Sequence, residues 1–344
     1  MGAEKVSVQT TKINNRRYLG NKYKLLPFIT EIVTENCGNF NSFTDIFAGT
    51  GAVASAYTNK QLTTNDILFS NYISNTAWFS PEDFDWDKLV GFINQYNNLS
   101  VITENYMTKN FSETYFSHDI CSKIGFIRED IEDKKNSKVI NPREYAILLT
   151  SLLYAMDRIA NTCGHYDAWR QNIDLSDQVL ELRMLSAEKN LNPNNQCFNT
   201  DSNELAKNIR SDIVYLDPPY NSRQYCDAYH LVENVARWQK PEVFGVAKKM
   251  DRTTLKSKYC TRSASLAFDD LISKLDTKYI LVSYNNMEHK GNDRSNARIS
   301  DTQIMESLKK RGAVQVFSET YKAFTTGKSD RNDNQERLFL CKCQ

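Results

Sequence analysis

The stretch Ile213-Val214-Tyr215-Leu216-Asp217-Pro218-Pro219-Tyr220 decides the fold of this chain. Four residues with a strong preference for β-structure precede two prolines, which can neither continue a helix nor donate hydrogen bonds to a neighbouring strand. The buried strand must therefore end at Asp217. In an open parallel sheet, this carboxyl edge is where ligands bind.

The residues that follow this strand suit one kind of ligand. Asp217 offers a carboxylate that only accepts hydrogen bonds, Pro218 and Pro219 keep the backbone extended with its carbonyls free, and Tyr220 offers an aromatic ring. These groups fit a planar ring with an exocyclic amine, such as a nucleobase, because two acceptors can take its N–H protons while Tyr220 stacks on its face. An ordinary proline-rich turn is the alternative interpretation.

Length and composition are those of a globular protein. The chain has 344 residues, of which 40% are hydrophobic and 25% charged, enough for one large domain with an insertion or for two domains. The longest mostly apolar run, Tyr145 to Met156, is too short to span a bilayer, and Met1 to Thr11 lacks the apolar segment of a signal peptide. We expect a cytoplasmic protein without a membrane partner.

Charge and cysteine usage limit the possible partners. The net charge of +1 gives no global attraction to a polyanion, so a nucleic-acid interface must be local. Basic residues gather in Lys12 to Lys24 and in Arg237 to Arg262, although lysine-rich loops are often only solvated. The eight cysteines form no Cys-x-x-Cys pair, and with four histidines they predict reduced thiols and no metal.

Two earlier segments also pair a strand with a carboxylate. Ser42 to Phe47 alternates like a strand, and the turn Ala48-Gly49-Thr50-Gly51 then opens a predicted helix from Ala52 to Tyr57, as in the first unit of a nucleotide-binding sheet. Gln61 to Asp66 and Gln196 to Asp201 each predict a further strand that ends in an acid, so that with Asp217 three strands end in a carboxylate. A lone Asp at such a place can be a helix cap, but three successive strand ends argue against coincidence.

The remaining chain predicts helices and further strands around this sheet. The alternation stops between Tyr72 and His165, which we interpret as an insertion at one rim of the sheet. The polar and aromatic loop Asp157 to Gln171 is suited either to contacting bases or to being a satisfied surface loop. Helices are predicted over Tyr23 to Val33, Ser122 to Lys134, Pro142 to Met156, Asp227 to Trp238 and Gln303 to Lys310, and strands over Tyr279 to Asn285, Ala313 to Tyr321 and Glu336 to Cys343, the last two antiparallel.

These motifs resemble the α-class, Dam-like DNA adenine-N6 methyltransferases over nearly the whole chain. The order is Tyr18-Leu19-Gly20-Asn21-Lys22, Phe47-Ala48-Gly49-Thr50-Gly51, Asn65-Asp66, Thr200-Asp201-Ser202 and Asp217-Pro218-Pro219-Tyr220. The run Tyr220 to Tyr225 and the pair Asn161-Thr162 resemble single-chain methylases of restriction–modification systems. The resemblance implies a Rossmann-like, mostly parallel α/β sheet with helices on both faces, and S-adenosylmethionine as cofactor. It also implies a catalytic domain over residues 1–72 and 166–344, with a target-recognition domain inserted at residues 73–165.

The resemblance also assigns roles to individual residues. The catalytic set is Asp217, Pro218, Pro219 and Tyr220. The cofactor set is Tyr18, Lys22, Phe47, Ala48, Gly49, Gly51, Asp66, Asp201 and Ser202, in which Asp66 takes the ribose hydroxyls and Asp201 the adenine amine. Candidate DNA contacts, which we take from the loops and basic segments, are Arg158, Asn161, His165, Arg223, Tyr225, Lys248, Lys249, Arg252, Lys256 and Lys258. No residue is assigned to a metal.

The sequence thus predicts a site-specific methyltransferase that acts on an adenine flipped out of duplex DNA, with a separately encoded endonuclease as a possible partner and a monomer or weak dimer as its form. Methylation of cytosine N4, or of adenine in structured RNA, is the alternative enzymatic function. By the family pattern, Asp rather than Ser or Asn at the first place of the motif favours adenine. A DNA-binding regulatory protein is the non-enzymatic alternative, and a pure binder has no need of Asp217 at a strand end.

Overall fold

The structure, a computed structural model, describes residues 9–16, 18–100, 103–285, 297–320 and 335–344. Residues 1–8 of the N-terminal segment, Arg17 of the basic cluster and Tyr321 at the end of a predicted strand lie outside the described residues. No helix in the described part of the chain is long and apolar enough to cross a membrane.

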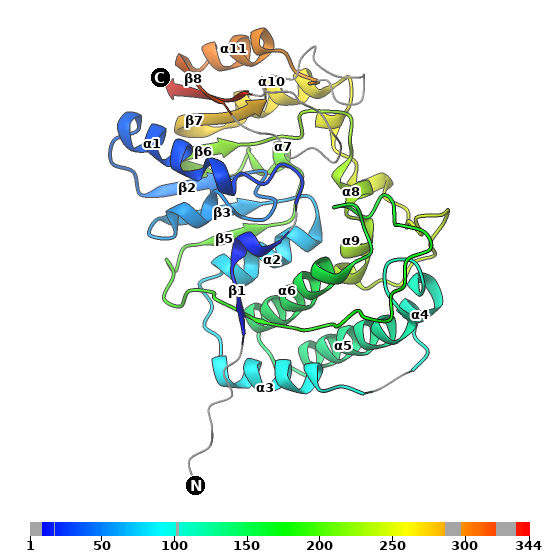
Figure 1. Ribbon diagram of the computed structural model, residues 1–344. Helices are drawn as coiled ribbons and strands as arrows, with labels where there is room; N and C mark the ends of the chain where they lie inside the picture. The colour runs from blue at the N-terminus through cyan, green and yellow to red at the C-terminus, as the bar shows by residue number, and fades with distance from the viewer. Residues whose placement is uncertain (1–8, 17, 101–102, 286–296, 321–334) are drawn as a thin grey trace.

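Within the described residues, seven strands form a central sheet in the order β5-β3-β2-β6-β7-β9-β8 (Figure 1). The strands are β2 (Ser42–Asp45), β3 (Gln61–Asn65), β5 (Gln196–Phe198), β6 (Arg210–Leu216), β7 (Asp276–Asn285), β8 (Gly312–Thr320) and β9 (Gln335–Cys343). The first five strands in this order, from β5 to β7, are parallel to one another, whereas β9 runs antiparallel to β7 and to β8. The predicted α/β class and the antiparallel C-terminal pair are confirmed. The strand order reverses direction between β2 and β6, which is where such sheets form a ligand crevice.

Both faces of the sheet are covered. Along β6, Ile213 and Tyr215 belong to one apolar cluster, whereas Val214 and Leu216 belong to another on the opposite face. Helices α10 (Ala264–Lys274) and α11 (Asp301–Lys309) pack against the second cluster, and α1 (Leu26–Asn36) and α2 (Phe69–Phe79) against the first (Figure 1). Burial on two sides explains why β6 is apolar at every position of its second half.

The region between β3 and β5 is largely helical. It contains α3 (Trp86–Asn97), α4 (Tyr106–Phe111), α5 (His118–Asn136) and α6 (Pro142–Ile159). Helix α6 starts at the predicted proline, and the Asn141 side chain accepts from Glu144 N at 2.8 Å. The predicted apolar stripe is wider in the structure, since every residue from Arg143 to Met156 is buried.

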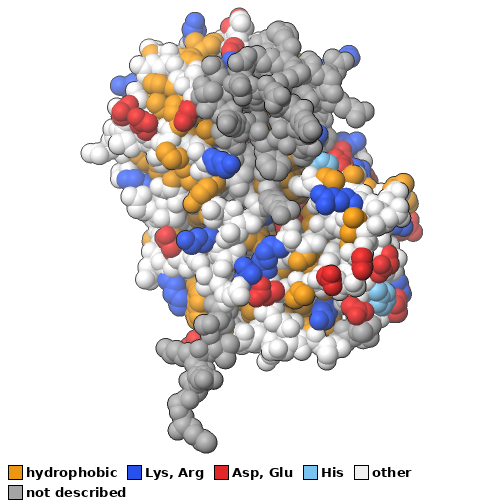
Figure 2. Space-filling model, in the orientation of Figure 1, with side chains coloured by type: hydrophobic (Ala, Val, Ile, Leu, Met, Phe, Trp, Pro, Cys, Tyr) orange, Lys and Arg blue, Asp and Glu red, His pale blue; other side chains and the backbone are white. Residues whose placement is uncertain are grey.

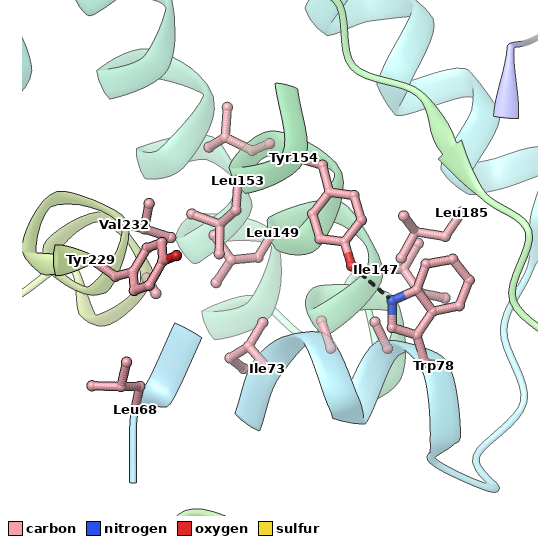
Figure 3. Packing of buried hydrophobic residues seen from close by; sticks show 14 of the residues in the cluster. Leu68, Ile73, Trp78, Ile147, Leu149, Leu153, Tyr154, Leu185, Tyr229 and Val232 are labelled. Atoms are coloured by element: carbon pink, nitrogen blue, oxygen red, sulfur yellow. Dashed lines mark hydrogen bonds between the residues drawn. The ribbon is translucent and has the colours of Figure 1, made fainter. Parts of the chain in front are cut away.

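This burial arises because α2, α5 and α9 pack around α6. In Figure 3, Ile73 and Trp78 of α2 face Ile147, Leu149 and Tyr154 of α6, and Trp78 Nε1 donates to the Tyr154 hydroxyl at 3.3 Å. The same apolar cluster includes residues of β2 and β3. The helical region therefore shares its core with the sheet, and the boundaries of the target-recognition domain at residues 73 and 165 remain a proposal.

Two predicted helices differ in detail. The helix expected from Ala52 is a short 3-10 turn, η3 (Ala54–Tyr57), and the one expected over residues 227–238 is divided into α8 (Tyr225–Ala228) and α9 (His230–Arg237). The break falls at Tyr229, whose ring stacks on Tyr18 at 4.6 Å and whose hydroxyl accepts from Leu19 N at 2.7 Å. These tertiary contacts override the local helical preference.

The remaining elements are β1 (Thr10–Thr11), β4 (Met184–Leu185), α7 (Ser202–Leu205), η1 (Ile13–Asn15), η2 (Tyr23–Leu25), η4 (Thr253–Leu255) and η5 (Lys258–Cys260).

Candidate active site

A cavity of about 220 Å³ opens at the carboxyl edge of the parallel strands. Asp45, Asp66, Asp201 and Asp217 line it from the ends of β2, β3, β5 and β6, respectively. Further predicted residues in its wall are Tyr18, Lys22, Phe47, Ala48, Gly49, Ser202, Pro219, Tyr225, Lys256 and Lys258. The cavity wall thus brings together residues between positions 18 and 259, and the acids at the strand ends meet at one edge of the sheet as predicted.

The turn after β2 needs glycine at two places. Gly49 and Gly51 have φ values of 52° and 79°, which side chains with a Cβ rarely adopt. Gly49 N donates to Asp66 Oδ2 at 2.9 Å, so the turn also fixes an acid of the cavity. A Cβ at Gly51 would lie 2.5 Å from Asn75 Oδ1 and 2.7 Å from Phe79 Cε2. Gly51 therefore lets the turn pack on α2.

Gly51→Ala should lower the free energy of unfolding by about 2 to 4 kcal/mol, because it combines a strained backbone with an overpacked contact. Urea denaturation followed by circular dichroism measures this change. Gly91→Ala is the matched control, since Gly91 lies in α3 and, apart from its chain neighbours and its own helix backbone, no described atom lies within 4 Å of an added Cβ. That variant should be neutral or up to about 1 kcal/mol more stable. Equal midpoints for Gly51→Ala and the unchanged protein would contradict the packing role of Gly51.

Asp66 is held in place by backbone amides. Oδ2 accepts from Gly49 N, and Oδ1 accepts from Leu68 N at 2.8 Å. Burial raises the pKa of Asp66 to about 6, although the N–H of Leu68 acts in the opposite direction. The carboxylate is pre-oriented by these amides and by the Asn71 side chain, and it keeps a lone pair for a ligand hydroxyl.

Asp201 has a structural role as well as a place in the cavity wall. Its Oδ1 accepts from Asn203 N at 2.9 Å and from Glu204 N at 3.3 Å, so the side chain caps the start of α7. The helix-cap interpretation is therefore correct for Oδ1, and a contact of Asp201 with the cofactor remains a prediction. Ser202 is buried beside it, with Oγ 3.3 Å from Asn203 Oδ1.

Asp217 pairs with a lysine from the N-terminal segment. Lys22 Nζ lies 2.9 Å from Asp217 Oδ1 and 3.3 Å from Glu336 Oε1. Burial raises the pKa of Asp217 to about 6; the Lys22 ammonium lowers this pKa and the Glu336 carboxylate raises it. The resemblance assigned Lys22 to the cofactor set; the structure places its ammonium against the Asp217 carboxylate and also in the cavity wall, so a contact of Lys22 with the cofactor remains a prediction. Glu336 was missed, because it lies on β9 and belongs to no motif.

Asp45 is a second residue that sequence reasoning missed. It is 1% exposed, and its Oδ1 has no hydrogen-bond partner among the described residues. Burial and the nearby Asp217 and Asp66 carboxylates raise the pKa of Asp45 well above its usual range. The signal was present, since Asp45 also stands at the carboxyl end of a strand, just before the glycine turn.

The aromatic residues around Asp217 are fixed by mutual contacts. Tyr220 packs edge-on against Tyr284 with ring centroids 6.4 Å apart, and its carbonyl accepts from Arg298 N at 2.7 Å. Tyr225, predicted to contact DNA, stacks on Tyr18 at 5.4 Å inside the cavity wall. Pro218 is buried behind this edge.

The segment from Thr254 to Tyr259 closes one side of the cavity. The Gln224 amide bonds to both backbone groups of Ser257, donating to its carbonyl at 3.1 Å and accepting from its N–H at 2.8 Å. Tyr259 packs edge-on against Phe47 and donates to Asn203 Oδ1 at 2.8 Å. Lys256 and Lys258, predicted as DNA contacts, lie on this segment and also line the cavity.

Several of the other predicted DNA contacts already have protein partners. Asn161 Nδ2 donates to the carbonyls of Thr114 and Arg170, and Arg158 donates to the carbonyl of Glu181. The ammonium of Lys249 pairs with Asp167, and Arg252 Nε lies 2.6 Å from Asp227 Oδ1. These side chains stabilise loops within the protein, and a role in DNA binding would have to compete with these contacts.

The remaining predicted contacts are Arg223, Lys248 and His165. Arg223 and Lys248 make no ion pair with the described residues, and Arg223 is exposed. His165 accepts from Asp167 N at 3.3 Å, and burial lowers its pKa. In Figure 2, the Lys and Arg side chains of the visible face are interspersed with Asp and Glu side chains, in keeping with the small net charge.

A parallel sheet with a nucleotide-type glycine turn, acids at successive strand ends and Asp-Pro-Pro-Tyr at the crevice defines the class I methyltransferase fold. The model of the D12 class N6 adenine-specific DNA methyltransferases matches residues 18–295, and the chain belongs to this family.

Named relatives agree with this assignment. The chain is 39% identical over 290 residues to modification methylase StsI of Streptococcus sanguinis, an alignment that covers 78% of this chain and 44% of the relative. It is 32% identical to type II methyltransferase M.FokI of Planomicrobium okeanokoites, covering 88% and 48%, and 32% identical to M.NlaIII of Neisseria lactamica, covering 92% and 94%. The chain spans about half the length of StsI and M.FokI methylases and nearly all of M.NlaIII.

Proposed function

We propose that this chain is a site-specific DNA methyltransferase that transfers a methyl group from S-adenosylmethionine to the N6 amine of an adenine flipped out of duplex DNA. Asp217 carries this proposal. Its Oδ1 is engaged by Lys22, whereas Oδ2 makes no hydrogen bond among the described residues, at the edge of a cavity lined by three further acids. Relatives named as a modification methylase and as a type II methyltransferase support a role in restriction–modification. A separately encoded endonuclease as a possible partner is part of the proposal.

The groups in the cavity wall suit this cofactor. Besides its carboxylate, S-adenosylmethionine presents a sulfonium, an ammonium, two ribose hydroxyls and an adenine amine, which are cations or hydrogen-bond donors. Asp45, Asp66 and Asp201 supply the matching acceptors, and the partnerless Oδ1 of Asp45 is a buried acceptor suited to a cationic group. We assign the ribose to Asp66 and the adenine amine to Asp201. When bound, the cofactor supplies an activated methyl group.

The protein's own task is to make the amine nucleophilic and to orient it. The lone pair of an exocyclic amine is delocalised into the ring, so acceptors at both N–H groups are needed to localise it. Asp217 Oδ2 and the Pro218 carbonyl accept these protons, and Tyr220 stacks on the flipped base. Positioning for in-line displacement contributes the remaining part of the rate. Asp217 Oδ2 then takes the proton that the methylated nitrogen releases.

Transfer of tritiated methyl groups tests this function. The protein is incubated with labelled S-adenosylmethionine and either unmethylated plasmid DNA or structured RNA of similar length. We expect label in the DNA only. Label in the RNA only would support the RNA alternative, and tight DNA binding without any transfer would support the regulatory alternative.

Arg223 and Lys248 are the proposed phosphate contacts. Arg223→Ala combined with Lys248→Ala should weaken binding to cognate and random duplexes alike, because phosphate contacts position DNA without reading it. The slope of log K against log salt, measured by fluorescence anisotropy, should be smaller by about one to two units.

The double variant Lys60→Ala and Lys207→Ala is the matched control for this experiment. This control also removes two positive charges, but from the segments that precede β3 and β6, at the amino ends of the parallel strands. It should leave the salt slope unchanged. An unchanged slope for the Arg223 and Lys248 variant would move the phosphate contacts to the cluster Lys12 to Lys24.

A further inference from the structure

We propose that Glu336, anchored by Ser283, is a positioning residue that prevents Lys22 from neutralising Asp217 and so preserves Asp217 as a strong hydrogen-bond acceptor for the substrate amine. This inference rests on the function proposed above. It assigns a catalytic consequence to a residue of β9 that belongs to no sequence motif.

The geometry places one ammonium between two carboxylates. Lys22 Nζ lies 2.9 Å from Asp217 Oδ1 and 3.3 Å from Glu336 Oε1, and the exposed fractions of these side chains are 8%, 19% and 8%, respectively. The Ser283 hydroxyl, on the adjacent strand β7, donates to Glu336 Oε1 at 2.6 Å. The segment before η2 and the strands β6, β7 and β9 therefore each supply one member of this group.

The formal charge of the group explains its effect. Lys22 alone would form a neutral pair with Asp217, and such a pair accepts hydrogen bonds from an amine less strongly than an uncompensated carboxylate. With Glu336 the group carries a net charge of −1, and its members interact strongly because they are shielded from water. Lys22 thus orients Asp217 Oδ1, while Glu336 restores the negative charge that Oδ2 presents to the substrate.

A purely structural role does not require this charge. Burying a carboxylate is costly unless it is paired, and a glutamine at position 336 could still accept from Ser283 and from Lys22 through its side-chain oxygen. A neutral glutamine of the same shape would therefore pack as well as Glu336 does. Its consequence is electrostatic, and it acts on Asp217.

Glu336→Gln is the variant that tests this inference, because it keeps the shape and removes the charge. We expect kcat at saturating DNA and cofactor to fall by roughly tenfold, since a less basic acceptor is a weaker catalyst. The Kd for S-adenosylmethionine, measured by calorimetry, should not change, because Glu336 is absent from the cavity wall.

The pH profile separates an electrostatic role from a structural one. Burial and Glu336 raise the pKa of Asp217, and the ionised form is the stronger acceptor for the amine, so activity of the unchanged protein should fall as the pH drops through about 6. Removal of the Glu336 charge should move this acid limb to lower pH. The other titratable groups that face Asp217 are Lys22, Asp45, Tyr215, Tyr220 and Tyr225, and none of them changes in this variant.

Glu306→Gln, the same substitution at an exposed position of α11, is the matched control and should keep both kcat and the acid limb. Ser283→Ala is a second variant, which tests the inference independently if Glu336→Gln does not fold. It should lower kcat and leave the Kd for the cofactor unchanged. Wild-type kcat and an unshifted acid limb in a folded Glu336→Gln protein, or wild-type kcat in Ser283→Ala, would overturn the inference. Absence of transfer by the unchanged protein would instead refute the proposed function.

Discussion

Replacement of Asp217 by alanine is expected to lower kcat for DNA methylation by at least about 10³-fold, because the variant loses the charged acceptor that makes the amine nucleophilic. Cofactor affinity should stay within roughly tenfold, since Asp217 acts mainly on the target amine in the transition state. Single-turnover transfer of labelled methyl groups measures the rate, and calorimetry measures the affinity.

Asp217→Asn is the isosteric control for this variant. It keeps the side-chain volume and one neutral acceptor oxygen, so it should retain the fold and still lose most of the rate. The remaining Lys22–Glu336 contact, with 3.3 Å between Nζ and Oε1, should hold the lysine in place. Substantial transfer by both variants would mean that the carboxyl end of β6 is not the active site.

Asp66→Ala is expected to weaken S-adenosylmethionine binding by about 2 to 4 kcal/mol, because the carboxylate would accept charge-assisted hydrogen bonds from the ribose. The pKa of Asp66 is raised to about 6 by burial, so the affinity of the unchanged protein should also fall as the pH drops through this value. The alanine variant should lack the part of this pH dependence that Asp66 causes. Calorimetric titration at several pH values measures both effects.

The loss of two backbone hydrogen bonds to Asp66 could also disturb the turn at Gly49. Thermal unfolding of Asp66→Ala therefore accompanies the titration, and Asp66→Asn provides a variant that keeps one acceptor oxygen. Asp87→Ala, at an exposed position in the first turn of α3, should bind the cofactor normally. An unaltered Kd in a folded Asp66→Ala protein would remove Asp66 from the cofactor site.

The sheet and its acidic edge could be predicted because their signals are local. The two prolines end β6 just before Asp217, and the glycine turn ends β2. The acids at 66 and 201 could be placed in the same way, since the ends of parallel strands meet at one edge. Asp45 obeys this rule too, since it is the last residue of β2 and lines the same cavity.

The contacts that modify Asp217 could not be predicted from local patterns. Lys22 and Glu336 lie near opposite ends of the chain, and no spacing relates a 3-10 turn before α1 to a strand at the far side of the sheet. The same holds for Lys249, which sequence alone offers as a phosphate contact but which pairs with Asp167 in the fold. Residue type shows what a side chain can bind, and only the tertiary structure shows what it already binds.

The most direct test of the central claim is the identity of the methylated nucleoside. Plasmid DNA incubated with the protein and S-adenosylmethionine is digested to nucleosides and analysed by liquid chromatography and mass spectrometry. The arrangement of Asp217, Pro218 and Tyr220 predicts N6-methyladenine, which should be missing after treatment with Asp217→Ala. N4-methylcytosine as the product, or no methylated nucleoside at all, would contradict it.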